Sequence, residues 1–213
     1  MTQQLKHPFT CIISGPTGCG KTIFAIALVE NSHMLISPPP EDIVWCYGEY
    51  QDSYNKIAKS GVKLHDGLPD LDQFDGRRRT LILLDDLMHE TDERVAKIFT
   101  KQSHHRNISA IYITQNLFHS NRHNRTLNLN AHYIVLFKNP RDAAQISHLA
   151  RQMYPNKSKF LIEAFRDSTD RPHGYLFLDL KSDTDEQLRV RTNVLLHDRE
   201  PEVGLLPYAY VHK

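Results

Sequence analysis

The chain has 213 residues, of which 40% are hydrophobic and 24% charged, and its formal net charge is +1 at neutral pH. This composition is ordinary for one folded domain with a sizeable core, and it excludes a global positive field that would by itself indicate a nucleic-acid partner. No apolar run reaches the roughly 18 residues that predict a membrane-spanning helix, so we expect no membrane partner.

Short β runs alternate with helical segments from residue 9 to about residue 170. The predicted strands are Phe9–Ser14, Ile43–Tyr47, Thr80–Asp85, Ser109–Thr114 and Tyr133–Phe137. The predicted helices are Lys21–Asn31, Asp52–Lys59, Asp92–His104, Arg141–Met153 and Lys157–Asp167. Two of the strands, 80–85 and 133–137, are apolar almost throughout, which is typical of parallel strands buried on both faces. The alternation predicts an α/β fold, with a mostly parallel sheet between layers of helices.

The pattern changes after residue 170, and we divide the domain into a core, 1–170, and an extension, 171–213. Two β runs, 174–180 and 187–195, are joined by a polar segment, which predicts a β-hairpin added at the sheet edge. Arg189 and Arg191 alternate on one face of its second strand and are candidates to face the nucleotide or a neighbouring subunit. Residues 207–213 are expected to form a tail.

The N-terminal segment lacks the long apolar stretch of a secretory signal peptide, so we expect an intracellular, non-secreted protein. The three cysteines, Cys11, Cys19 and Cys46, show no C-x-x-C spacing. Free thiols in a reducing compartment are therefore expected rather than a disulfide framework.

Residues 15–22, "GPTGCGKT", match the phosphate-binding loop pattern G-x-x-x-x-G-K-[ST] between an apolar strand and a helix-forming segment. In such a loop, backbone N–H groups and the helix N-terminus face the phosphates of a nucleotide. Lys21 would reach the β- and γ-phosphates and the Thr22 hydroxyl would bind Mg²⁺. The predicted nucleotide-binding residues are Gly15, Pro16, Thr17, Gly18, Cys19, Gly20, Lys21 and Thr22.

Two acidic residues follow the apolar strand "TLILL", at the edge of the sheet where an open α/β fold binds its ligand. Asp85 is predicted to hold the Mg²⁺, largely through water or Thr22. Asp86 is predicted to polarise the attacking water, in a position where ring-forming P-loop ATPases usually carry a glutamate. A structural acid is the alternative for Asp86, and a strand-terminal cap is the alternative for Asp85.

Gln115 follows the predicted strand 109–114, where its amide would contact the γ-phosphate; the alternative is an amide that caps the next turn. Arg106 ends the preceding helix and is a candidate arginine finger for a neighbouring subunit's nucleotide. The alternative is a cation that complements the helix dipole. Arg122, His123 and Arg125, in a segment expected to be a loop, are candidates for DNA-phosphate contacts, or else belong to a solvated loop or subunit interface.

Taken together, several blocks resemble the viral genome-packaging ATPases of the FtsK–HerA superfamily, in the type found in Polinton/Maverick elements, adintoviruses and large DNA viruses such as poxviruses. The resemblance runs from about residue 9 to residue 195, and its blocks are "GPTGCGKT", "WCYGEYQ", "LILLDDLM", "HHRNISAIYITQNLF", "LNLNAHYIVLFKNPRD" and "YLFLDL…LRVRTN". The phosphate loop alone is unspecific, whereas "HHRNIS…ITQNLF" and "LFKNPRDAAQI" are far more specific.

The resemblance implies a RecA-like core that forms a hexameric or pentameric ring and uses ATP and Mg²⁺ to thread double-stranded DNA into a capsid. It implies Asp85 as the Mg²⁺ acid, Asp86 as the catalytic acid, Gln115 as the γ-phosphate sensor and Arg106 as the trans finger. Capsid proteins would be further partners, and the protein would act in an infected cell or at a capsid. The aspartate at position 86 departs from the superfamily's glutamate, which leaves the identity of the base open.

Three other classes of function remain open on the sequence. An AAA+ helicase loader or initiator would carry a helical lid after the fifth strand, where this chain has a predicted β-hairpin. A small-molecule or nucleoside kinase would need an acceptor pocket and would not need Gln115. A non-hydrolysing, nucleotide-dependent assembly switch would follow if Asp86 cannot act as a base.

Overall fold

A nine-stranded sheet organises the chain, as the computed structural model shows for residues 4–85, 87, 93–102, 106–118, 122–141, 144–195 and 207–212. Only the backbone is described for residues 101–102 and 122–124. The strand order is β11-β10-β9-β8-β2-β7-β6-β4-β5. The strands are β2 (Thr10–Ser14), β4 (Asp42–Tyr47), β5 (Lys63–Asp66), β6 (Thr80–Asp85), β7 (Ile108–Thr114), β8 (Tyr133–Phe137), β9 (Tyr175–Asp179), β10 (Val190–Thr192) and β11 (Tyr208–Ala209).

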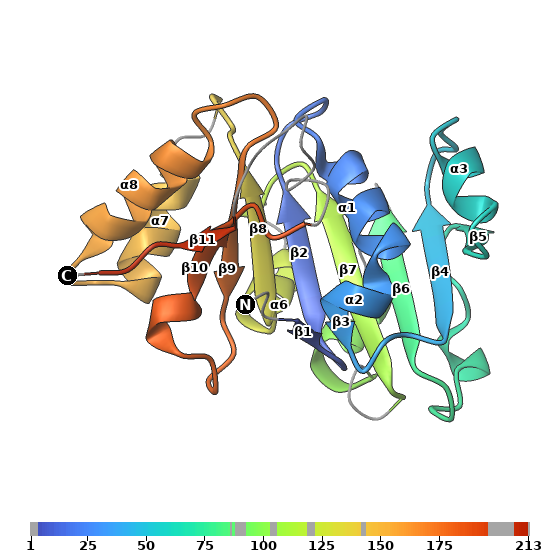
Figure 1. The fold of residues 1–213 in the computed structure, drawn as a ribbon. Coiled ribbons are helices and arrows are strands. Elements are labelled where there is room, and N and C mark those ends of the chain that lie inside the picture. The colour runs from blue at the N-terminus through green and yellow to red at the C-terminus, as the bar shows by residue number, and fades with distance from the viewer. Residues whose placement is uncertain are drawn as a thin grey trace.

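The strands from β8 to β5 are all parallel, so their carboxyl ends meet at one edge of the sheet (Figure 1). All five predicted strands are confirmed within a residue or so. The short strand β5, which pairs with β4, was not predicted, because "KLHD" is polar and only half-buried. Two further short strands, β1 (Leu5–Lys6) and β3 (Ile36–Ser37), pair in a separate small sheet that was also not predicted.

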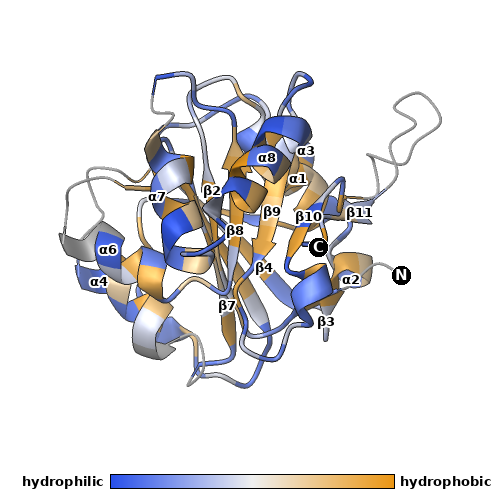
Figure 2. Cartoon of the chain, turned by 90° about the vertical axis from the view of Figure 1, so that its left-hand side faces the viewer, coloured by the Kyte–Doolittle hydropathy of each residue, from blue (hydrophilic) through white to orange (hydrophobic). Residues whose placement is uncertain are grey.

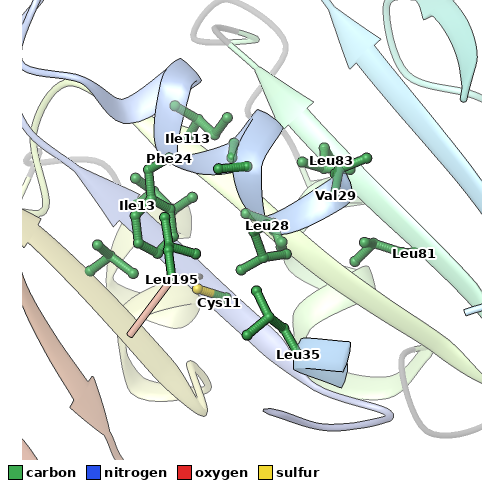
Figure 3. Packing of buried hydrophobic residues seen from close by; sticks show 14 of the residues in the cluster. Cys11, Ile13, Phe24, Leu28, Val29, Leu35, Leu81, Leu83, Ile113 and Leu195 are labelled. Atoms are coloured by element: carbon green, nitrogen blue, oxygen red, sulfur yellow. The ribbon is translucent and has the colours of Figure 1, made fainter. Parts of the chain in front are cut away.

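Side chains of the central strands are buried on both faces of the sheet, which explains why these strands are apolar throughout. Cys11 and Ile13 of β2 belong to one hydrophobic cluster, whereas Ile12 between them belongs to the other. Figure 3 shows the first cluster, in which Phe24 and Leu28 of helix α1 pack over these strands. Figure 2 shows the strands as mainly hydrophobic and the outer surfaces of the helices as largely hydrophilic.

Helices cover both faces of the sheet, as predicted. One face carries α1 (Lys21–Glu30), α2 (Ser32–Leu35) and α3 (Tyr54–Ala58), whose buried residues belong to the first cluster. The other carries α4 (Glu93–Lys97), the π-helical turn η2 (Ile98–Gln102), α6 (Arg122–Leu129), α7 (Ala144–Met153) and α8 (Ser158–Ser168). The remaining turns are η1 (Leu71–Gln73) and η3 (Glu186–Leu188). The predicted helices begin and end within three residues of these wherever the structure describes the ends.

Residues 122–126, expected to be part of a loop, instead form the start of helix α6, so that prediction was wrong. The segment "RHNRTLNL" is polar and has only two apolar residues, of which Leu129 is 70% exposed, whereas Leu127 is 1% exposed and belongs to the second cluster. Burial of this residue against the neighbouring helices therefore stabilises a helix that propensity did not indicate.

The C-terminal hairpin was predicted correctly. Strand β9 pairs antiparallel with both β8 and β10, so the hairpin extends the sheet beyond β8. The expected tail was only partly correct, because Tyr208–Ala209 forms strand β11 against β10. The tyrosine hydroxyls of Tyr208 and Tyr210 both donate to Asp167 of α8, which gives this segment partners in the folded domain.

Candidate nucleotide-binding site

A cavity of about 260 Å³ opens at the edge of the sheet where the parallel strands end. Its lining comes from the loop after β2, the start of α1, and the residues that end or follow β4, β6 and β7. The lining residues are Thr17, Gly18, Gly20, Lys21, Thr22, Ile23, Gln51, Asp85, Ile113, Thr114 and Gln115. The fold therefore brings the predicted phosphate loop, metal acid and sensor amide to one cavity.

The loop between β2 and α1 has the backbone shape that the phosphate-loop pattern predicts. Gly18 and Gly20 have φ angles of 78° and 111°, a left-handed region that side chains disfavour. Helix α1 begins directly afterwards at Lys21, so the partial positive charge of its N-terminus faces the loop. The ammonium of Lys21 donates to the carbonyl oxygens of Gly15 and Pro16 at 2.7 and 2.9 Å, which holds it within the loop. This arrangement suits a chain of phosphates.

Gly15 is required for packing rather than for its backbone angle. A Cβ atom at this position would lie 2.7 Å from Cys19 Sγ and 2.7 Å from Phe137 Cβ. The loop thus packs directly against strand β8 at its first glycine.

Aromatic side chains support the loop from below. Phe24 of α1 packs edge-on against Tyr175 of β9, with ring centroids 4.8 Å apart, and against Phe137 of β8 at 6.2 Å. The hydroxyl of Tyr175 accepts a hydrogen bond of 2.8 Å from the backbone N–H of Val194. Tyr175 of the C-terminal hairpin thereby packs against the helix that follows the phosphate loop.

Asp85 ends strand β6 and is only 3% exposed, yet it lines the cavity together with Thr22. Its Oδ2 accepts a hydrogen bond of 2.8 Å from the hydroxyl of Tyr54. A carboxylate and a hydroxyl are hard oxygen donors, and Mg²⁺ in nucleotide sites is held by one or two such groups together with phosphates and water. These residues fit a magnesium ion. The part of the chain that the structure describes contains no cluster of three or more His, Cys, Asp or Glu that could hold a metal by itself.

Gln115 and Asn116 both follow β7, but Asn116 caps the next turn and Gln115 lines the cavity. The side-chain oxygen of Asn116 accepts from Phe118 N at 2.9 Å and from Gln145 Nε2 at 2.7 Å, so this amide caps the turn. Gln115 is exposed and lines the cavity. Its role as a γ-phosphate sensor stays a prediction, but its position allows that role.

Two of the other predicted site residues are Asp86 and Arg106. Asp86 lies outside the described residues. Arg106 precedes β7, at the side of the sheet where the parallel strands begin. There its guanidinium donates to the carbonyl oxygens of Leu71 and Phe74 and forms a 2.6 Å ion pair with Asp72. The structure therefore places Arg106 away from the cavity of its own chain, and its role in trans stays a prediction.

The three candidate DNA contacts all lie on helix α6. Arg125 is exposed, whereas the side chains of Arg122 and His123 lie outside the description. α6 is on the face of the sheet opposite α1, next to α4 (Figure 2). Whether these residues contact DNA stays a prediction.

Arg191, a candidate to face the nucleotide or a neighbour, is instead buried in its own domain. It pairs with Asp179 at 3.2 Å, and its guanidinium lies 4.7 Å from the ring centroid of Phe177. Arg189 pairs with Glu186 at 2.8 Å and also donates to carbonyl oxygens of the hairpin turn. Arg191 is a buried residue of β10 whose charge is paired, whereas Arg189 lies just before β10, is half-buried and makes its contacts within the hairpin turn.

Cavity residues that the sequence did not single out include Gln51 and Ile23. Gln51 belongs to the segment after β4, and Ile23 of α1 is 63% exposed beside the phosphate loop. The block "WCYGEYQ" contains Gln51, but it was used only for the resemblance. The sequence does contain a signal for Gln51, because polar residues directly follow the predicted strand 43–47. The sequence does not reveal that β4 lies next to β6, which is what brings Gln51 to the cavity.

Cys19, inside the loop, has a raised pKa because the thiol is partly buried, which outweighs the nearby charge of Lys21. The thiol therefore stays protonated near neutral pH and fills space against Gly15 rather than acting as a nucleophile. All three cysteines are free, as predicted.

Comparison with known proteins gives a clear result at the level of fold. The sequence matches no family model and no curated protein. The genome-packaging NTPase B204 of Sulfolobus turreted icosahedral virus 2, solved in complex with ATP-gammaS, superposes with a TM-score of 0.56 over 83% of this chain and 94% of its own, at 12% sequence identity. The fold is that of a RecA-like P-loop NTPase.

Another RecA-like structure is more distant. A KaiC-like protein from Pyrococcus horikoshii OT3 gives a TM-score of 0.38 over 61% of this chain and 72% of its own, at 17% identity. Within the described residues, no helix combines the length and the apolar character that crossing a membrane requires.

Proposed function

We propose that this protein is an ATP-driven double-stranded DNA translocase that packages a viral or virus-like genome into a capsid, and that it works as a ring. The observation that carries the nucleotide part is one cavity that brings together Lys21 and Thr22 at the start of α1, Asp85 at the end of β6 and Gln115 directly after β7. The packaging part is supported by the specific sequence blocks and by the likeness to B204, which extends over 94% of that protein.

In this proposal the phosphate loop and the N-terminus of α1 bind the triphosphate, and Lys21 neutralises its β- and γ-phosphates. Thr22 and Asp85 would hold Mg²⁺, which supplies charge stabilisation at the phosphates when bound. Asp86 would orient and deprotonate the attacking water, and Gln115 would contact the γ-phosphate. Gln115 lies in the chain between β7 and α6. Loss of the γ-phosphate would therefore remove a contact of the segment that connects these two elements.

A ring would complete the site across subunits. Arg106 is the proposed trans finger, and an arginine finger increases the rate by roughly 10³–10⁵. In the single chain its guanidinium is bound by Asp72 and two carbonyl oxygens, so assembly would have to exchange these contacts for the neighbour's phosphate. Hydrolysis would then depend on assembly.

DNA would be bound by phosphate contacts from α6, with Arg122, His123 and Arg125 as candidates. Such contacts are independent of sequence, as a packaging motor requires, and they weaken steeply with salt. The small net charge of +1 means that this basic site must be local rather than a property of the whole surface.

The helicase-loader alternative would need a helical lid after the fifth parallel strand. Helices α7 and α8 do follow β8, but Ile146, Leu149, Leu161 and Ala164 bury them in the second hydrophobic cluster as a covering layer of the sheet. The hairpin β9–β10 then follows and extends the same sheet. This arrangement favours the translocase over the loader.

The test is phosphate release by the wild type and by Lys21→Ala, with and without double-stranded DNA, combined with the mass in solution. The proposal predicts turnover by a ring that double-stranded DNA stimulates, and none by the variant. Turnover only with an added nucleoside acceptor would indicate a kinase, and tight ATP binding without any turnover would indicate an assembly switch.

A mixing experiment tests the trans finger. Arg106→Ala subunits are mixed with Lys21→Ala subunits, each of which should be inactive alone, and ATP hydrolysis by the mixture is measured. Activity is expected to return, because a subunit with an intact Lys21 can receive the arginine of a neighbour with an intact Arg106. If the mixture stays inactive, Arg106 does not act in trans.

A further inference from the structure

The metal-binding carboxylate proposed above has a buried tyrosine as its partner. Tyr54 Oη donates to Asp85 Oδ2 at 2.8 Å, and Tyr54 and Asp85 are 0% and 3% exposed. Tyr54 begins helix α3, which the chain reaches directly after strand β4. In the sheet β4 is the neighbour of β6, and Tyr47 lies opposite Asp85 in the register.

Aromatic packing fixes the position of the Tyr54 hydroxyl. Its ring lies 5.4 Å from that of Trp45, 5.6 Å from that of Tyr47 and 5.8 Å from that of Tyr50, measured between ring centroids. A ring enclosed on several sides has little rotational freedom, so the direction of its O–H group is set by the core rather than by solvent.

The segment between β4 and α3 also reaches the cavity. The backbone N–H of Gly48 donates to the carbonyl oxygen of Asp85 at 3.3 Å, and Gln51 lines the cavity. Residues 48–54 therefore contact Asp85 through its backbone and its side chain, and form part of the cavity that Asp85 lines.

We propose that Tyr54 is a positioning residue for the metal site. This inference rests on the proposed function only because it requires that Asp85 bind the metal of a metal–nucleotide complex. A hydroxyl that donates to one carboxylate oxygen prevents the carboxylate from rotating, so that its other oxygen keeps one direction. Partners of this kind orient metal ligands, and their loss typically weakens metal binding by about 10–100-fold.

Tyr54→Phe removes the hydroxyl and keeps the packed ring. The matched control is Tyr133→Phe, since Tyr133 is also buried, at 1% exposed, and its hydroxyl accepts a 3.1 Å hydrogen bond from Lys6 N far from the cavity. For each protein, binding of a non-hydrolysable ATP analogue is measured in EDTA, and Mn²⁺ affinity of the analogue complex is measured by electron paramagnetic resonance.

The expected result is that Tyr54→Phe binds Mn²⁺ about 10–100-fold more weakly while its nucleotide affinity in EDTA equals that of the wild type. A merely structural role would lower both affinities together, and either that result or unchanged Mn²⁺ affinity would overturn the proposal. Tyr133→Phe should match the wild type in both measurements; a loss of Mn²⁺ affinity there as well would also count against a specific role for Tyr54.

The comparison needs no turnover. A wild type that binds the metal–nucleotide complex but does not hydrolyse ATP would contradict the translocase function, and the difference between the two variants would still decide the role of Tyr54. A wild type that binds no metal with the nucleotide would overturn both.

Discussion

Replacing Gly15 with alanine should strain the contact between the phosphate loop and strand β8. The new Cβ would lie 2.7 Å from both Cys19 Sγ and Phe137 Cβ. Non-bonded carbon atoms are most favourable at about 3.5–4.0 Å, so each contact is roughly 1 Å too short. Phe137 cannot move away easily, because its ring packs against Phe24 and Tyr175.

Overpacking of this kind typically costs about 1–3 kcal/mol, and two simultaneous overlaps place Gly15→Ala at the upper end, about 3 kcal/mol. Adding Cys19→Ala removes the sulfur and should recover roughly half of that loss, because the overlap with Phe137 remains. A double-mutant cycle measures this coupling directly.

The free energy of unfolding is measured by urea denaturation with tryptophan fluorescence, since Trp45 is the only tryptophan and is 0% exposed. Gly61→Ala is the control, because Gly61 has a φ of 86° and its added Cβ would meet nothing within 4 Å. It should lose only the backbone cost of about 1–2 kcal/mol. If Gly15→Ala is as stable as the wild type, or if Cys19→Ala restores it completely, the described contact with β8 is wrong.

Asp179→Ala leaves the buried charge of Arg191 unpaired and should lower the free energy of unfolding by about 3–5 kcal/mol; a loss below about 1 kcal/mol in urea denaturation would contradict the buried pair. Thr22→Ala should abolish Mg²⁺-dependent phosphate release and leave nucleotide binding in EDTA unchanged, which equilibrium binding and phosphate assays check; full activity would remove Thr22 from the metal site. Burial raises the pKa of Cys46 from 9.0 to about 12, so the folded state retains a proton that the unfolded state loses first. Stability should therefore be independent of this group below pH 9 and fall at higher pH by up to about 1.4 kcal/mol per pH unit, and Cys46→Ala should show a shallower decline.

Elements whose signal is local were predictable from the sequence. The strands 80–85 and 133–137 are continuous apolar runs because both of their faces are covered, and the phosphate loop is a backbone motif that its glycines specify. The order of predicted strands and helices was enough for the α/β layered fold. The carboxyl-edge position of Asp85 and Gln115 followed, because parallel strands all end at the same edge.

What the sequence did not reveal depends on contacts between distant segments. Helix α6 is polar and is held by the burial of Leu127, and β5 and β11 are short edge strands with weak patterns. Tyr54 lies 31 residues before Asp85 in sequence, and their contact requires the strand order β6-β4, which no local pattern encodes. Arg191 looked like a functional cation because its partner, Asp179, is on the neighbouring strand.

Displacement of a triplex-forming oligonucleotide from linear double-stranded DNA tests the central claim most directly, because a motor that moves along the duplex removes the third strand. The account predicts displacement by the wild type with ATP and Mg²⁺, and none with a non-hydrolysable analogue or with Lys21→Ala. ATP hydrolysis that DNA stimulates but that leaves the triplex in place would contradict translocation.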